Sequence, residues 1–160
     1  MNKEKIELTP IGVIHTPFEE AHGTPIQPSA AKGAQGRVEI LPEYVEALRD
    51  LQGFERIWLI YWFHKCGDYK PTVVPFRDKV ERGLFATRAP ARPNKIGMSV
   101  VKLIGISGNV LTVEGVDILD GTPLLDIKPY VPEFDSYDCE RIGWLGGSGV
   151  DRDRADDRFE

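Results

Sequence analysis

Short apolar stretches, some with alternating polar positions, occur throughout the chain, and this pattern predicts β-strands. Three of them precede residue 70, at residues 8–15, 37–40 and 54–64. The last is the most apolar stretch of the chain, and its aromatic and β-branched side chains are typical of a buried central strand. A further short strand is expected at residues 84–86.

The second half of the chain continues this pattern. Strands are predicted at residues 98–106 and 110–114, with Gly108 and Asn109 as the turn of a hairpin. An Asp-Gly turn ends residues 116–122, and residues 123–132 then close the core. Sixteen glycines and twelve prolines favour strands joined by many turns over a helical bundle.

One helix interrupts the strands. Apolar residues recur at helical spacing after Pro42, which suits the first turn of a helix, and Gly53 ends the pattern. We expect this helix to cover the open face of a sheet or barrel and to carry no chemistry.

Two long loops are the candidate functional segments. Residues 16–36 are too long for a simple connection, and such loops are usually functional or disordered. Residues 87–94 contain two prolines and hold an extended, stiff path that presents Arg88 and Arg92, with Lys95 just beyond. Binding sites often lie on such loops, but a solvated surface loop with ordinary arginines is an equally good interpretation.

Composition narrows the class of protein. A chain of 160 residues, 41% apolar and 28% charged, suits one globular domain. Cys66 and Cys139 form no CxxC pair, which favours a reducing, intracellular location. There is no signal-peptide pattern and no apolar run near the ~18 residues that span a bilayer, so we expect no membrane association and a cytoplasmic location.

The charge is unevenly distributed. The net charge of −5 argues against broad nonspecific binding to nucleic acid. Residues 77–102, however, carry seven basic residues against two acidic ones. This local excess suits a selective anionic partner, although a charge-balanced surface would have the same composition.

Several common catalytic signatures are missing from the sequence. It has no Gly-rich phosphate loop and no GxGxxG between a strand and a helix. It also has no HExxH and no cysteine–histidine cluster, so no metal site is predicted, and it has no GxSxG nucleophile elbow. An enzyme of this kind would depend on positioning its reactants more than on a special nucleophile.

Six motifs, in this order and spacing, resemble the TsaA-like (YaeB-like, TrmO) family of S-adenosylmethionine-dependent tRNA methyltransferases. The resemblance covers about residues 8–132. The motifs are Ile-Gly-Val-Ile-His-Thr-Pro-Phe at 11–18, Thr-Pro-Ile-Gln at 24–27, Ile-Trp-Leu-Ile-Tyr-Trp-Phe-His at 57–64, Arg-Gly-Leu-Phe-Ala-Thr-Arg at 82–88, Arg-Pro-Asn-Lys-Ile-Gly-Met-Ser at 92–99 and Leu-Asp-Gly-Thr-Pro-Leu-Leu-Asp-Ile-Lys-Pro-Tyr at 119–130.

The resemblance implies a fold, a cofactor and a substrate. The fold is mainly β, a small closed or partly open barrel with one covering helix and long loops, unlike Rossmann-type methyltransferases. The cofactor is S-adenosylmethionine, bound near the interface of a homodimer. The implied substrate is threonylcarbamoyl-adenosine, just 3′ of the tRNA anticodon, methylated on N6.

The resemblance also assigns residues to the site. Arg88 suits the carboxylate of the donor or an RNA phosphate, Asp117 and Asp120 suit ribose hydroxyls, and Ile26 replaces an arginine common in bacterial members. Arg82, Arg92 and Lys95 are the candidate RNA-binding residues. The expected cofactor-binding residues are Pro25, Ile26, Gln27, His64, Lys65, Arg88, Met98, Asp117, Leu119, Asp120, Gly121 and Thr122.

The expected mechanism is in-line transfer of the methyl group to N6, with the reactants held in position. Because this nitrogen is amide-like, a base near it would help by roughly 10²- to 10⁴-fold. His64, Asp120 and Asp126 are the unranked candidates, although a strand-end histidine is often only structural and Asp120 suits a turn cap.

Three alternatives stay open. The chain could be a barrel that senses S-adenosylmethionine without turnover, or a methyltransferase with another acceptor. A hydrolase built on His64 and an aspartate is the third, although no spacing requires it. Some relatives carry an additional C-terminal domain, whereas here residues 1–145 are expected to form the barrel domain and residues 146–160 a flexible polar tail.

Overall fold

The computed structural model describes residues 4–147, 154–156, 158 and 159. Six strands form a closed barrel in the order β1-β2-β7-β6-β3-β8, and β8 pairs with β1 to close it. The barrel strands are β1 (Gly12–His15), β2 (Gln35–Ile40), β3 (Arg56–Trp62), β6 (Ile96–Ser107), β7 (Val110–Glu114) and β8 (Thr122–Pro129). The predicted mainly β barrel is therefore confirmed, and it is closed.

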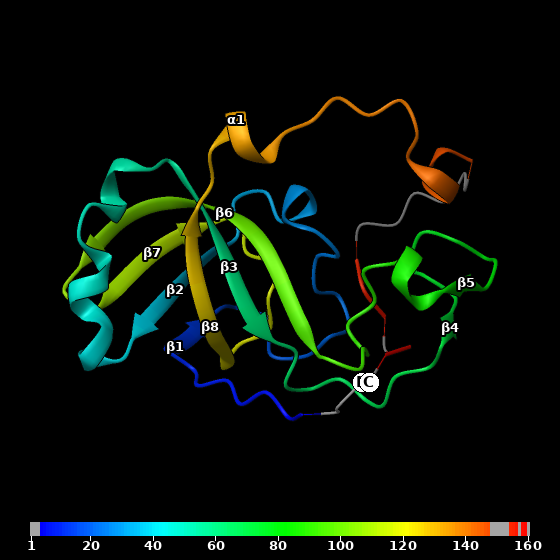
Figure 1. Ribbon diagram of the computed structural model, residues 1–160, viewed down its shortest axis with the longest axis horizontal. Coiled ribbons are helices and arrows are strands. Elements are labelled where there is room, and N and C mark those ends of the chain that lie inside the picture. Colours follow the sequence, from blue (N-terminus) through cyan, green and yellow to red (C-terminus); the bar gives the residue numbers. More distant parts are fainter. Residues whose placement is uncertain (1–3, 148–153, 157, 160) are drawn as a thin grey trace.

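The remaining elements are short. Strands β4 (Thr72–Val73) and β5 (Arg82–Gly83) form a separate two-stranded sheet. Figure 1 shows this sheet on the opposite side of the molecule from the helical turns η2 and η3, with the barrel between them. The helices are η1 (Pro28–Ala30), η2 (Pro42–Leu48), η3 (Leu51–Gly53), η4 (Leu84–Ala86), α1 (Pro132–Asp135) and η5 (Gly143–Gly146).

Alternation along the strands builds the barrel core. On β3 the side chains of Ile57, Leu59 and Tyr61 point inward and are almost completely buried. Because successive side chains of a strand point to opposite faces, the barrel strands contribute alternate residues to the same interior. Strand β6 is long enough to pair with β3 in its first half and β7 in its second, with a register shift between Leu103 and Gly105.

The predicted covering helix is present as 3₁₀ turns. Its first segment, η2, begins at Pro42, and Tyr44 and Leu48 pack against the barrel core. Asp50 adopts a left-handed conformation (φ 67°), which ends this segment before η3 begins at Leu51. The helix covers the core as expected.

One predicted strand is wrong. Residues 84–86 form the 3₁₀ turn η4, because the backbone groups at its ends form turn and loop hydrogen bonds in place of a strand ladder. The amide of Leu84 donates to Pro71 O at 2.9 Å, and the amide and hydroxyl of Thr87 both donate to Leu84 O. Buried Leu84 followed by exposed Phe85 mimics the alternation of a strand in the sequence.

Candidate functional site

A cavity of about 740 Å³ lies at one end of the barrel. Its floor comes from the ends of barrel strands and the connection before β8: Tyr61, residues 63–66, residues 96–98, residues 117–119 and Thr122. We call the rest of its lining the loop wall. The loop wall consists of Ala21, residues 24–27, 75–77 and 85–90, Arg92, Trp144, Leu145, Ala155, Asp156 and Phe159.

This cavity gathers most of the residues expected to contact the cofactor. Ten of the twelve line it, the exceptions being Asp120 and Gly121. They come from five separate stretches of sequence: the loop before η1, the residues after β3, the loop after η4, the start of β6, and the connection that leads into β8. The fold therefore brings together segments that are up to about a hundred residues apart.

A chain of three polar side chains lies at the floor. The hydroxyl of Ser99 lies 2.6 Å from Asp117 Oδ1 and donates to it. Tyr61 Oη lies 3.0 Å from Ser99 Oγ, and since the single hydrogen of Ser99 goes to Asp117, Tyr61 donates to Ser99. Hydrogen bonds therefore link Tyr61 on β3 to Ser99 on β6, and Ser99 to the carboxylate of Asp117.

Burial changes the acidity of both ends of this chain. It raises the pKa of Asp117 to about 7, even though the Ser99 hydrogen bond, its own backbone amide and Arg88 act in the opposite direction. Burial and the nearby Asp117 also raise the pKa of Tyr61, so the phenol keeps its proton at neutral pH. Asp117 therefore exchanges a proton in the physiological range.

Arg88 connects two loops of the loop wall. Its Nη1 donates to Gln27 Oε1 at 2.8 Å, which links the loop before η1 to the loop after η4. The amide of Gln27 donates in turn to the carbonyl of Ile26 at 2.8 Å. The guanidinium is exposed and retains donors for an anionic group of a ligand.

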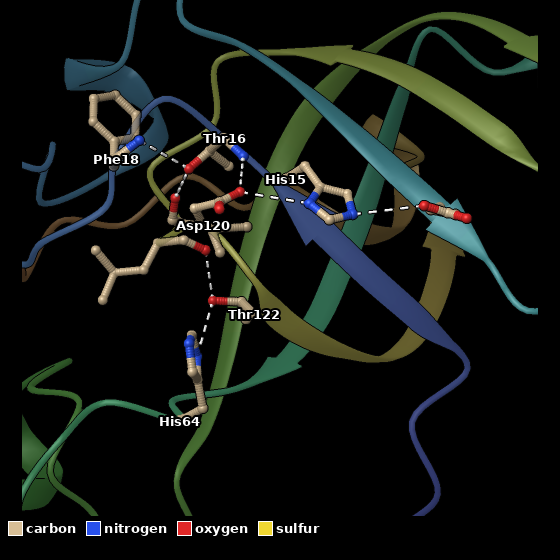
Figure 2. Close-up of polar contacts among 9 residues, drawn as sticks. His15, Thr16, Phe18, His64, Asp120 and Thr122 are labelled. Carbon is tan, nitrogen blue, oxygen red and sulfur yellow. Dashed lines mark hydrogen bonds and ion pairs between the residues drawn. The ribbon is translucent and has the colours of Figure 1, made fainter.

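His64 and Thr122 contact each other at the edge of the floor. Thr122 Oγ1 donates to the carbonyl of Leu119 at 2.7 Å and lies 3.3 Å from His64 Nδ1 (Figure 2). Since the hydroxyl has one hydrogen, we assign a proton to Nδ1, which leaves Nε2 as an acceptor. Burial, followed by the nearby Lys65, lowers the pKa of His64, so the imidazole is neutral at pH 7.

Asp120 faces the other side of the same turn. Its Oδ1 accepts the amide of Thr16 at 3.0 Å and lies 3.6 Å from His15 Nδ1 (Figure 2). The neighbouring amide of Gly121, at φ 73°, donates to Ile14 O at 2.9 Å. Asp120 and Gly121 therefore fasten the turn to the end of β1 and lie outside the cavity lining.

Asp126 is separate from the cavity. It lies on β8, where its carboxylate is 2.9 Å from Lys128 Nζ and also accepts the amide of Ile127. It is not among the residues that line the cavity. Of the three candidate bases, His64 is the one that the fold places at the cavity.

Four basic side chains near the cavity have partners within the chain. Arg82 pairs with the buried Asp78 at 2.7 Å, and this contact lowers the pKa of that carboxyl. Arg92 donates to two loop carbonyls and lies over the ring of Phe85. Lys65 and Lys95 donate to the carbonyls of Glu19 and Cys66. These contacts order the loops, and Arg92 and Lys65 also line the cavity.

The C-terminal segment contributes to the loop wall, which the sequence did not suggest. Arg154 forms a bridge with Pro25, and Ala155 exchanges backbone hydrogen bonds with Gly23 and Thr24. Phe159 packs edge-on against Phe76 at 5.1 Å. The flexibility expected for residues 146–160 stays a prediction, and residues 148–153, 157 and 160 of that segment lie outside the described part of the chain.

Several aromatic lining residues were also missed. Tyr61 and Phe63 follow the alternation of β3 and are indistinguishable in sequence from core residues. Trp144 donates from Nε1 to Ala86 O at 2.8 Å, and Arg82 lies 5.8 Å from its ring. A tryptophan and a phenylalanine within a polar C-terminal stretch were the available signal, since such residues tend to pack against something.

The described residues were searched for metal-binding groups and for membrane-spanning helices. No group of three or more His, Cys, Asp or Glu side chains among them is arranged to hold a metal ion. Nor does this part of the chain contain a helix long and apolar enough to cross a bilayer.

Comparison with known proteins places this barrel in a family. The family described as "tRNA-methyltransferase O N-terminal domain" matches residues 13–136. A probable S-adenosyl-L-methionine-binding protein of Pyrococcus abyssi is 53% identical over 152 residues, covering 94% of this chain and 83% of the relative. The tRNA (adenine(37)-N6)-methyltransferase of Escherichia coli K12 is 39% identical over 136 residues, covering 79% of this chain and 58% of that enzyme.

A solved structure shares the fold as well. The crystal structure of TrmO from Pseudomonas aeruginosa superimposes with a TM-score of 0.74 at 42% identity, covering 88% of this chain and 62% of that one. The chain therefore spans about three fifths of the bacterial proteins it matches, and most of the archaeal one.

Proposed function

Because the chain belongs to the tRNA-methyltransferase O family, we propose that it is an S-adenosylmethionine-dependent methyltransferase whose donor binds in the cavity at the end of the barrel. The observation that carries this proposal is that ten residues expected from the motifs line one cavity. The names of the Pyrococcus abyssi and Escherichia coli relatives support the donor and the reaction.

The cavity suits the donor in size and chemistry. About 740 Å³ lies within the range of small-molecule sites, which combine apolar walls with a few polar groups. Phe63, Met98 and Leu119 offer apolar surface to an adenine ring. Arg88 would bind the carboxylate of the amino-acid part, since a guanidinium matches carboxylate geometry.

S-adenosylmethionine, when bound, supplies an electrophilic methyl group. The chain itself positions the acceptor, excludes water with the loop wall and accepts a proton. Aligning the two reactants in this way lowers the barrier, because it turns a bimolecular step into an effectively unimolecular one.

We further propose that the acceptor is N6 of threonylcarbamoyl-adenosine at position 37 of tRNA. Support for tRNA comes from the printed activity of the Escherichia coli and mouse relatives, and support for the threonylcarbamoyl group from the motifs alone. Arg82, Arg92 and Lys95, held close to the cavity by their internal contacts, form a basic surface for the RNA phosphates. The enzyme would act in the cytoplasm, where tRNA is found.

A homodimer is part of the same proposal. Phe85, Ile96 and Met98 line the cavity and are also 81%, 41% and 53% exposed. Exposed apolar side chains beside a site are suited to a second subunit that covers it. Sedimentation analysis of the purified chain should give twice the 17.9 kDa monomer mass, and a monomer at concentrations that support methyl transfer would contradict this part.

A donor-binding barrel without turnover is the second candidate. It is favoured by the relative at 53% identity, whose name refers to binding only. The two functions differ in one outcome, because a sensor binds the donor and forms no methylated product.

Methyl transfer from labelled S-adenosylmethionine to tRNA lacking the modification, followed by nucleoside mass analysis, tests the proposal. Label on N6 of threonylcarbamoyl-adenosine is the expected result. Tight donor binding without label would favour the sensor or another acceptor, and absence of donor binding would contradict the proposal as a whole.

A matched pair of variants tests the place of the donor. Arg88→Gln should weaken donor binding about 10-fold or more, because a charge-assisted contact to a carboxylate is worth roughly 1.5–3 kcal/mol. Arg37→Gln, an exposed arginine on β2 away from the cavity lining, makes the same chemical change and should leave binding unaltered. Equal effects from both variants would place the donor elsewhere.

A further inference from the structure

We infer that Asp117 is the general base of the reaction and takes the proton of the acceptor nitrogen, with Ser99 and Tyr61 as its positioning residues. This inference rests on the proposed methyl transfer and deepens it. The sequence suggested Asp117 as a contact for ribose hydroxyls, and put forward His64, Asp120 and Asp126 as bases.

Geometry favours Asp117 over the other carboxylates. It lines the cavity floor, whereas Asp120 and Asp126 do not. Asp120 accepts the amide of Thr16 and lies 3.6 Å from His15, so its carboxylate is engaged at the end of β1. Asp126 is paired with Lys128 on β8.

His64 lines the cavity but is a poorer base. To accept a proton it must become a cation, and both burial and the neighbouring Lys65 oppose that charge. Asp117 becomes neutral when it accepts a proton, and burial favours the neutral form. The same surroundings therefore promote proton uptake at Asp117 and oppose it at His64.

The hydroxyl chain fixes the orientation of Asp117. Ser99 is 2% exposed and donates to Oδ1 at 2.6 Å, and Tyr61, 4% exposed, donates to Ser99 at 3.0 Å. Because both donors lie on paired barrel strands, β6 and β3, they are held rigidly. An incoming proton would then be carried on the second oxygen, Oδ2.

Other charges around the cavity act on Asp117 only weakly. Arg88 is the charged side chain that lowers its pKa, after the Ser99 hydrogen bond and its own backbone amide. The net result is a pKa of about 7, close to the working pH at which a general base is most effective. The titratable or charged groups that line the cavity with Asp117 are Tyr61, His64, Lys65, Cys66, Arg77, Arg88, Arg92 and Asp156.

The step balances without a further reactant. The N6–H bond of the acceptor breaks, and its proton forms an O–H bond with the Asp117 carboxylate. The nitrogen electron pair forms the new bond to the methyl group. The bond between that methyl group and the sulfonium of the donor breaks, and its electron pair stays on sulfur as a neutral thioether. Asp117 then returns its proton to solvent.

The test compares Asp117→Asn, Ser99→Ala and Asp138→Asn for turnover, donor affinity and pH profile. Asn keeps the shape and can still accept from Ser99, but it cannot take a proton. We expect Asp117→Asn to lower turnover by about 10²- to 10⁴-fold while donor affinity changes less than about threefold. Asp138 is exposed and outside the cavity lining, so Asp138→Asn should match the wild type.

Ser99→Ala provides a readout that a merely structural role would not change. The wild-type rate should rise with pH to a plateau, with a midpoint near 7. Since the Ser99 hydrogen bond stabilises the carboxylate, its loss should move the midpoint to higher pH and leave the plateau turnover largely intact. A ¹³C NMR titration of the free protein should show the same upward shift for the Asp117 carboxyl.

Three outcomes would overturn the inference. The first is turnover of Asp117→Asn close to that of the wild type, and the second is donor affinity that falls as much as turnover. The third is a midpoint unchanged in Ser99→Ala. In all three the wild type is active, so the proposed function stands; a wild type that binds no donor would instead overturn the proposed function, and this inference with it.

Discussion

The barrel and the loop wall are held together in different ways. Six hydrogen-bonded ladders close the barrel, and Ile14, Val38, Ile57, Leu59 and Leu111 inside it are completely buried. Among the described residues, the loop wall packs on one small apolar cluster, formed by Val73, Leu84 and Ala89 with Phe159 against it. Its other contacts are mostly single hydrogen bonds, many of them from side chains to loop carbonyls. The barrel thus supplies a rigid floor, while the wall is assembled from separate weak contacts.

This difference bears on function. A site that must admit a large RNA and enclose a small donor benefits from a fixed floor and a more adaptable wall, because regions with few buried apolar contacts open at lower cost. Asp117, Ser99 and Tyr61 lie on the rigid side, and Arg88 and Gln27 on the adaptable side. Variants in the barrel should therefore change stability most, and variants in the wall should change ligand binding.

The largest effect is expected in the barrel core. Leu59→Ala removes a completely buried side chain from β3 and should reduce the free energy of unfolding by about 2–5 kcal/mol. Chemical denaturation would measure this loss of stability, and we expect the m-value to stay unchanged. A loss below about 1 kcal/mol would mean that the surrounding core relaxes to fill the space left by the side chain, and that the barrel is no more rigid than the loop wall.

The pH dependence of stability at the floor is the next largest effect. Folding raises the pKa of Asp117 from 3.8 to about 7, so between these values the folded chain binds more protons than the unfolded chain. The contribution of Asp117 to the free energy of unfolding is therefore greatest at acid pH and is lost as the pH rises through 7. Between pH 4 and pH 8 the wild type should lose up to about 4 kcal/mol relative to Asp117→Asn, at ~1.4 kcal/mol per pKa unit. A stability difference independent of pH would contradict the raised pKa.

A glycine where the floor meets the barrel should give a smaller loss. A Cβ on Gly97 would lie 2.6 Å from Tyr61 Cζ and 2.8 Å from Phe63 Cζ, both in rings that line the cavity. Gly97→Ala should cost about 1–3 kcal/mol through overpacking and should weaken donor binding by displacing these rings. Gly105→Ala on the same strand, with no atom within 4 Å of its Cβ, is the control that should be tolerated.

The smallest change in stability is expected in the wall. Phe159→Ala removes an edge-to-face contact with Phe76, worth about 0.5–1.5 kcal/mol. Because Phe159 lines the cavity, donor dissociation should accelerate more than unfolding does, which stopped-flow binding and thermal melts would compare. An unchanged rate of donor dissociation would mean that the C-terminal segment does not help to hold the donor.

The same division explains what the sequence could predict. Strands such as β3 and β7 were located to within about two residues, because an alternating or apolar pattern follows from burial on one face. The turn at residues 84–86 was taken for a strand, since a buried leucine beside an exposed phenylalanine has the same pattern in either conformation. Local pattern does not record that Leu84 is bonded to Pro71 and Thr87.

The residues of the candidate site could be predicted only through the motifs. Motif matching named ten cavity residues, but hydrogen-bond partners decide the role of each, and these come from distant segments. Asp120 and Asp117 are three positions apart, yet one fastens a turn to β1 and the other ends a buried hydroxyl chain. The packing of Phe159 against Phe76 joins residues far apart in the chain and has no local signal.

A crystal structure of the chain with S-adenosylhomocysteine, the product of the donor, would show whether the donor binds in the cavity at the end of the barrel. We expect the ligand in the cavity at the end of the barrel, with its carboxylate at Arg88 and its adenine against Met98 and Leu119. A ligand bound elsewhere would contradict this expectation, for example in the smaller apolar groove of about 290 Å³ formed by Ile6, Leu8, Pro10, Trp62, Pro123 and Leu125.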